Sequence, residues 1–131
     1  MYMKNMISPL FRIIPVALIL ISGFCLFASP SRGDQAEAEQ GKKLFESRGC
    51  TACHTIGKGK LTGPDLAGVS KRRDEEWIKK WLKSPETMLM TDPVAKEMLG
   101  VYMVPMPNQG LSDEEIDVII DYFEYVDNNK K

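Results

Sequence analysis

Two cysteines and one histidine stand together in the sequence Cys50-Thr51-Ala52-Cys53-His54, and this histidine is the only one in the 131-residue chain. The third and last cysteine, Cys25, lies far upstream in an apolar stretch. A zinc site takes about four nitrogen or sulfur ligands, so one is hard to build here. A four-cysteine iron–sulfur site and a scaffold of several disulfides are excluded by the same count.

The order Cys-x-x-Cys-His is the signal for covalent attachment of haem. Two thiols three positions apart reach two vinyl groups on one edge of a porphyrin, and the next residue can then bond the iron. A thioredoxin-like redox pair has the same cysteine spacing, but it requires a preceding strand that this sequence does not predict. A structural disulfide would leave His54 unexplained. We therefore expect one haem c, held by thioethers to Cys50 and Cys53, with His54 as an iron ligand.

The N-terminal part of the chain differs from the rest. An almost wholly apolar run from Ile13 to Ala28 follows two basic residues, as in a secretory signal. The run is shorter than the roughly 20 residues that span a bilayer comfortably, although an uncleaved anchor is the alternative. We expect a signal peptide or anchor over residues 1–33 and one domain over residues 34–131. The domain should work in the periplasm or at the outer face of the cytoplasmic membrane.

The apolar spacing of the domain is helical, and no strand is predicted. Four helices are expected from their start and stop signals. In chain order these signals are Gly49 after the first helix, Asp74-Glu75-Glu76 before the second and Ser84-Pro85 after it, Asp92-Pro93 before the third, and a capping box from Ser112 to Glu115 before the last. A hydrophobic core of this size gives only marginal stability on its own, so we expect a bound group to fill its centre.

The residues around the motif resemble those of class I cytochromes c. The likeness is carried by Gly41 to His54, by Gly63-Pro64-Asp65-Leu66-Ala67-Gly68, and by Met106-Pro107 shortly before Leu111 to Glu115. It extends over about residues 36–127. The resemblance implies an all-α class I cytochrome c fold, with about four helices wrapped around one covalently attached haem. Within this family, the chain is similar to small bacterial monohaem cytochromes.

The same resemblance implies roles for single residues. The carbonyl of Pro64 matches the position that accepts the second N–H of the proximal histidine, which makes His54 a better donor. Gly41 and Phe45 match a contact of the first helix with the last, against Ile119 and Tyr122.

The sixth iron ligand is expected to be a methionine, because a chain with one histidine cannot supply two imidazoles. Methionine–histidine ligation also raises the haem potential. The candidates are Met88 and Met90 in a connection after the second helix, Met98 on a helical stripe as core filler, and Met103 and Met106 in the last loop. Prolines on both sides restrict the backbone at Met106, and the distal methionine of the family matches this position. We expect Met106 as the ligand, with Met103 as its main rival.

Tryptophans and charges leave alternatives open. Trp77 or Trp81 could donate its indole N–H to a haem propionate, or could simply pack in the core. Residues 58–83 carry eight bases and four acids, and residues 111–127 carry seven acids and no base. Ordinary solvated faces explain this pattern, while the alternative is a basic surface near the haem edge that steers an acidic redox partner. The net charge of -1 does not favour nucleic-acid binding, which needs a basic surface.

These features predict an exported monohaem cytochrome c that carries single electrons in a respiratory chain, with His/Met-ligated iron. Such a protein is an electron carrier and not an enzyme on its own. We expect a monomer that meets a donor and an acceptor protein, and that contacts the membrane only through an uncleaved N-terminal segment. The alternatives are a haem subunit of a larger oxidoreductase, and a haem sensor or enzyme with an open distal site.

Overall fold

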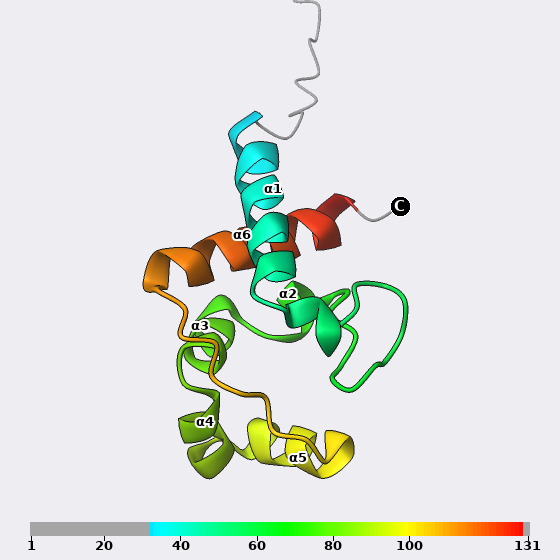
Figure 1. Cartoon of the computed structure of the whole chain (residues 1–131), viewed down its shortest axis with the longest axis vertical. Coiled ribbons are helices and arrows are strands. Elements are labelled where there is room, and N and C mark those ends of the chain that lie inside the picture. Colours follow the sequence, from blue (N-terminus) through cyan, green and yellow to red (C-terminus); the bar gives the residue numbers. More distant parts are fainter. Residues whose placement is uncertain (1–31, 130–131) are drawn as a thin grey trace, which may run out of the picture.

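A computed structural model describes residues 32–129, which form six α-helices and one turn of 3₁₀ helix (Figure 1). In chain order they are α1 (Arg32–Ser47), η1 (Cys50–Ala52), α2 (Val69–Arg72), α3 (Glu75–Lys83), α4 (Pro85–Thr91), α5 (Pro93–Tyr102) and α6 (Asp113–Asn129). The β pairing recorded within this range is one isolated bridge between Thr55 and Asp65. The all-α prediction is therefore confirmed.

The predicted signal peptide or anchor, residues 1–33, lies outside the described residues except for its last two. Those two, Arg32 and Gly33, are the first residues of α1. From residue 32 to residue 129, no helix has the length and apolar character needed to cross a membrane.

The predicted helix starts at Asp74 and Asp92 are present as side-chain caps. The Asp74 carboxylate accepts the backbone N–H of Trp77 at 2.8 Å, and the Asp92 carboxylate accepts that of Ala95 at 2.8 Å. Each bond satisfies a donor that the first turn of a helix leaves without a partner. Gly49, predicted to stop the first helix, has a φ of 74°, a conformation that glycine adopts without steric cost.

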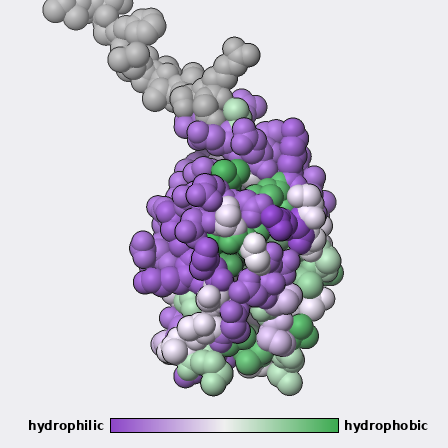
Figure 2. Space-filling view, turned by 60° about the vertical axis from the view of Figure 1, so that its left-hand side comes forward, coloured by the Kyte–Doolittle hydropathy of each residue, from purple (hydrophilic) through white to green (hydrophobic). Residues whose placement is uncertain are grey.

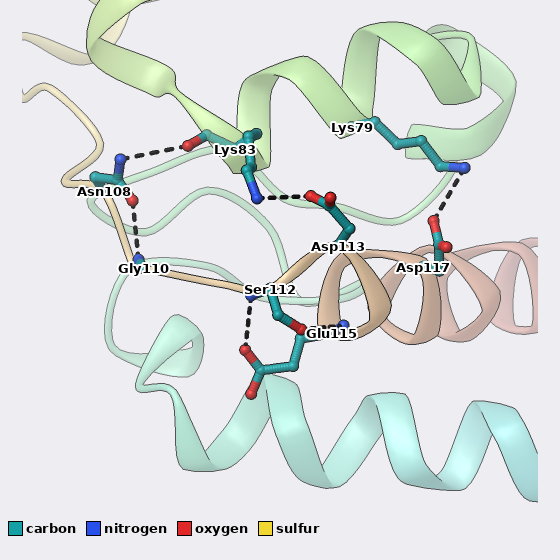
Figure 3. A network of polar contacts seen from close by, with 8 residues as sticks. All are labelled: Lys79, Lys83, Asn108, Gly110, Ser112, Asp113, Glu115 and Asp117. Atoms are coloured by element: carbon teal, nitrogen blue, oxygen red, sulfur yellow. Dashed lines mark hydrogen bonds and ion pairs between the residues drawn. The ribbon is translucent and has the colours of Figure 1, made fainter.

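The capping box of α6 forms as predicted (Figure 3). The Glu115 carboxylate accepts the backbone N–H of Ser112 at 3.0 Å, and the Ser112 hydroxyl accepts that of Glu115 at 3.2 Å. The Ser112 N–H, together with the guanidinium of Arg48, holds the pKa of Glu115 below its ordinary value. The start of α6 is thus tied both to its own first turn and to the end of α1.

Ion pairs join the predicted basic segment to the predicted acidic one (Figure 3). Lys83 lies 2.6 Å from Asp113, and Lys79 lies 2.9 Å from Asp117 and 2.7 Å from Glu75. The Glu75 and Asp117 carboxylates raise the pKa of the Lys79 ammonium. Part of the charge separation seen in the sequence is therefore neutralised between α3 and α6.

Two helices were not predicted. The second predicted helix does end before Ser84-Pro85, but Pro85 is also the first residue of α4, where its missing N–H costs nothing. The placement of Met88 and Met90 in a connection is thus wrong: both lie on α4, Met88 buried and Met90 exposed. The other unpredicted helix is the short α2.

The buried core lies where α1, α3 and α6 meet (Figure 1). It consists of Phe45, Ile78, Leu82, Leu111, Ile116, Ile119, Ile120 and Phe123. The Phe45 ring meets Phe123 edge-on with centroids 5.8 Å apart, and it also contacts Tyr122 at 6.0 Å. Gly41 lies against the backbone carbonyl of Val118. The expected contact of the first helix with the last is therefore present.

Adding one methyl group at this crossing should destabilise the protein. A Cβ at position 41 would overlap the Val118 carbonyl and lie 2.7 Å from the Cβ of Tyr122, so one helix would have to move. Gly41→Ala is expected to lower the free energy of unfolding by about 1–3 kcal/mol, the usual cost of overpacking. Urea denaturation followed by circular dichroism measures this loss.

Gly100→Ala is the matched control, because a Cβ at this position of α5 meets nothing within 4 Å. This change should leave stability unchanged or raise it by up to about 1 kcal/mol. Equal unfolding midpoints for the two variants would contradict close packing at Gly41.

Candidate cofactor-binding site

The motif forms a tight turn directly after α1. The backbone N–H groups of Cys53 and His54 both bond to the carbonyl of Cys50, at 3.1 and 2.9 Å. Both cysteines are free thiols. Burial raises the pKa of the Cys50 thiol, although its own backbone N–H and the Arg48 guanidinium oppose the shift. The turn therefore holds two free thiols and an imidazole next to each other.

These side chains line two adjoining cavities, of about 490 and 90 Å³. Cys50 lines the larger cavity, Cys53 lines the smaller one, and His54 lines both. The residues that both cavities share are His54, Pro64, Trp81, Met98, Tyr102 and Met106. The site residues expected from the sequence, Cys50, Cys53, His54, Pro64 and Met106, are thus brought together in space.

The walls of the larger cavity are mostly apolar. The apolar side chains come mainly from α1, α3, α5 and α6, among them Phe45, Leu82 and Phe123. Three bases, Lys60, Arg72 and Arg73, outnumber the two acids, Asp65 and Glu97. Ligand sites of proteins commonly combine apolar walls with a few polar groups that set orientation. This combination suits a flat apolar ring system that carries acidic groups at one edge.

The orientation of His54 is set by its neighbours. Its Nδ1 lies 3.0 Å from the carbonyl oxygen of Pro64, so Nδ1 carries the proton and donates it there. The other ring nitrogen, Nε2, then keeps its lone pair for a metal, and the hydrogen bond makes it a better donor. The contact expected between His54 and Pro64 is present.

Gly63 is a site residue to which the sequence analysis gave no role of its own. A Cβ at this position would lie 2.6 Å from Cε1 and 2.9 Å from Nδ1 of His54. Its N–H bonds to the carbonyl of Cys53 at 2.8 Å, which brings the backbone up to the motif. The glycine before Pro64 was visible in the sequence, but its closeness to the imidazole was not.

Two carboxylates organise the loop that carries Pro64. Asp65 accepts the N–H groups of Gly57 at 2.7 Å and Gly59 at 2.6 Å. Asp127, in the last turn of α6, accepts the N–H of Gly68 at 2.5 Å and both the N–H and the hydroxyl of Ser70, at 3.0 and 2.7 Å. Asp127 lies far from the loop in the chain, and no local signal in the sequence indicated its role.

Among the methionines, Met106 and Met98 line both cavities. The description of Met98 as core filler needs correction, because it lies at the cavity and not in the core cluster. Met103 is 79% exposed and ends α5 with a φ of 62°. Met106 is half-buried, and its sulfur accepts a hydrogen bond from the indole N–H of Trp81 at 3.1 Å.

The two tryptophans have different partners, although their rings stack with centroids 5.6 Å apart. The indole N–H of Trp81 bonds to Met106, whereas that of Trp77 is buried and has no hydrogen-bond partner within residues 32–129. A buried donor without a partner costs about 1–3 kcal/mol. The Arg73 guanidinium lies over the Trp77 ring, 5.3 Å from its centroid. An acidic group of a bound cofactor would therefore fit at Trp77.

Comparisons with known proteins agree with this arrangement. Residues 38–127 match the cytochrome c family. A "Cytochrome c-553-like" protein of Synechocystis sp. is 32% identical over 88 residues, which cover 66% of this chain and 83% of that protein. The solved cytochrome c from Rhodothermus marinus is 35% identical, with a TM-score of 0.70 over 74% of this chain and 82% of its own.

A cytochrome c domain from Pseudomonas putida is 37% identical, with a TM-score of 0.61 over 68% of this chain and 89% of its own. An engineered Rhodothermus marinus cytochrome c, solved with a bound carbene intermediate, is 33% identical, with a TM-score of 0.66 over 78% of this chain and 87% of its own. The matched residues include the Cys-x-x-Cys-His motif and the helices that surround it. The chain belongs to the cytochrome c family of haem-containing electron carriers and has the class I c-type fold.

Proposed function

We propose that this protein is an exported monohaem cytochrome c that carries single electrons in a respiratory chain. The observation that carries the proposal is that His54 and Met106 line the same cavities, with the thiols of Cys50 and Cys53 at the walls. When bound, haem c supplies an iron that alternates between ferric and ferrous states. The periplasm, or the outer face of the cytoplasmic membrane, is the proposed location, because the N-terminal apolar run is typical of an export signal.

Each residue of the site has a part in holding the cofactor. Cys50 and Cys53 would hold it through thioether bonds, and His54 would offer Nε2 to the iron while the Pro64 carbonyl accepts its Nδ1 proton in a hydrogen bond. Met106 would offer its thioether sulfur as a further ligand of the iron. With both of these ligands supplied by the protein, the iron would suit electron transfer and would have no position for a substrate.

The surroundings of the cofactor favour fast electron exchange. Apolar side chains such as Phe45, Ile119 and Phe123 line the larger cavity, so a bound haem would lie largely among apolar atoms. The indole N–H of Trp77, which has no partner within residues 32–129, would donate a hydrogen bond to a haem propionate. The Arg73 guanidinium, which lies over the Trp77 ring, would attract the same negative charge. Trp77 is thus the proposed propionate donor among the two tryptophans.

The proposed docking surface for redox partners lies over α4, α5 and the segment that follows α5. Apolar residues gather at the lower end of the face shown in Figure 2, over the part of the molecule that α4 and α5 form in Figure 1. The exposed large apolar residues of α4, α5 and the segment after it are Met90, Val101, Met103 and Val104. Lys60, whose ammonium lies 5.1 Å from the ring centroid of Tyr102, adds positive charge at the larger cavity. We expect a monomer that meets an acidic donor or acceptor here.

Purified, exported protein is expected to be red and to have the mass of the polypeptide plus one haem. If the signal is cleaved as expected, the polypeptide begins near Asp34. Intact-mass spectrometry of the periplasmic fraction measures both properties at once. Double replacement of Cys50 and Cys53 by alanine should remove the added mass, because no thioether can form. A colourless wild-type protein with the bare polypeptide mass would contradict the proposal.

Replacing Met106 should open the distal side of the iron. In Met106→Ala the weak sulfur-to-iron absorption band near the red end of the spectrum should disappear, and carbon monoxide should bind the ferrous protein. Met103→Ala should keep the band, because the Met103 side chain is exposed. Met98→Ala tests the other methionine at the cavity and should also keep it.

The three variants separate the alternatives. Loss of the band in Met103→Ala or Met98→Ala alone would show that the distal assignment is wrong. Carbon monoxide binding to the wild-type protein would instead favour a haem sensor or enzyme with an open distal site. Co-purification with other subunits would favour a haem subunit of a larger oxidoreductase.

Reversing one charge at the docking surface should slow electron transfer to an acidic one-electron redox protein. Lys60→Glu is expected to reduce the bimolecular rate several-fold at low ionic strength, and the difference should shrink as salt screens the charges. Stopped-flow mixing at a series of salt concentrations measures this effect. Lys42→Glu is the matched control, because Lys42 is an exposed lysine of α1 outside the lining of both cavities. Equal rates for the two variants would contradict docking at Lys60.

A further inference from the structure

We infer that Asp127 is a positioning residue for His54, which it reaches through α2 and the loop that precedes α2. The inference rests on the proposed ligation of iron by His54. Its basis is a set of three hydrogen bonds between the last turn of α6 and the start of α2. The half-buried Asp127 carboxylate accepts the N–H of Gly68 at 2.5 Å, the N–H of Ser70 at 3.0 Å and the hydroxyl of Ser70 at 2.7 Å.

Asp127 supplies a cap that α2 lacks in its own sequence. The residue before α2 is Gly68, which has no side chain to accept the N–H groups of the first turn. A capping residue normally lies next to the helix that it caps, whereas Asp127 lies 57 positions from Ser70. Because a carboxylate makes stronger hydrogen bonds than a neutral acceptor, these bonds fix the start of α2 on α6, against which α2 packs (Figure 1).

Arg72, the last residue of α2, transmits this fixed position back to the loop. Its guanidinium donates to the backbone carbonyl of Asp65 at 3.1 Å and also to that of Ala67. Asp65 directly follows Pro64 in the chain. The backbone on the C-terminal side of Pro64 is therefore held by a helix that is itself held by α6.

Pro64 depends on its neighbours for its orientation, because a proline has no N–H that could bond to a fixed acceptor. On its N-terminal side, the N–H of Gly63 bonds to the carbonyl of Cys53 at 2.8 Å, which ties this side to the motif. On its C-terminal side, the support comes from α2. The Pro64 carbonyl lies 3.0 Å from Nδ1 of His54, so a shift of the loop on either side changes this hydrogen bond.

A looser hydrogen bond at His54 has two measurable consequences. The bond from Nδ1 to a carbonyl makes the imidazole a better donor to a metal, and a better donor favours ferric over ferrous iron. Loosening the bond should therefore raise the reduction potential. It should also let the Nδ1 proton exchange with water more often, because the proton is released from its acceptor for a larger share of the time.

The first test is the exchange of the Nδ1 proton of His54 for deuterium, followed by NMR in the ferrous, haem-loaded protein. In Asp127→Ala this proton is expected to exchange about tenfold faster. The backbone amides of Ile119 and Ile120 in the core are the internal reference, because a general loss of stability accelerates their exchange as well. The expected result is a larger acceleration at His54 than at these two amides.

The second test compares reduction potentials. Asp127→Ala should shift the equilibrium about threefold toward ferrous iron, which is a rise of about 28 mV. Glu124→Ala is the matched control, because Glu124 is an exposed acid about one turn earlier on α6 and its removal changes the net charge by the same amount. The potential of this control and its Nδ1 exchange should stay close to those of the wild type.

The outcomes distinguish the inference from the function on which it rests. Equal acceleration at His54 and at the core amides, or equal potentials in Asp127→Ala and Glu124→Ala, overturns the inference and leaves ligation by His54 intact. If the wild-type protein shows no imidazole signals shifted by a haem ring current, ligation by His54 fails and the inference fails with it.

A second variant covers the case in which Asp127→Ala does not fold. Asp127→Asn keeps the size of the side chain and one carbonyl oxygen, but its amide group cannot accept the donors of Ser70. The same two changes are then expected in weaker form. Wild-type values of both the exchange rate and the potential would overturn the inference.

Discussion

The crossing of α1 and α6 is the contact on which the rest of the structure depends. Gly41 allows the two helices to approach until its backbone meets the carbonyl of Val118, and Phe45 then packs against Phe123. This contact joins the two ends of the described chain and leaves one side of α6 free to face α3. Because Phe45 and Phe123 also line the larger cavity, the crossing sets the position of its apolar wall.

Much of the fold could be predicted because the residues that start and stop a helix are its neighbours in the sequence. Asp74 and Asp92 cap the helices that follow them, and the capping box at Ser112 begins α6, as the residue types indicated. Pro85 was interpreted only as a stop, although a proline at a first helical position stops one helix and begins the next. The pairing of Lys83 with Asp113 could not be predicted, because it joins residues 30 positions apart.

The candidate site could likewise be predicted only in part. The motif from Cys50 to His54 is contiguous, so its chemistry could be predicted before any fold was known. The role of Pro64 came from a resemblance, and the structure supplies its distance from His54. Which tryptophan faces Met106, and which keeps a spare N–H, depends on the rotation of α3 about its axis. The apolar residues of α3 indicate which face turns toward the core, but their pattern does not specify which of the two rings meets the methionine.

The hydrogen bonds of Asp127 give the C-terminal turn of α6 an effect at a distance. Its carboxylate holds Gly68 and Ser70, which follow the loop that presents Pro64 to His54. The last turn of α6 therefore acts as a brace for the loop that orients the imidazole of His54. Fraying of this turn would release Gly68 and Ser70, and would loosen the contact between Pro64 and His54 while removing very little helix.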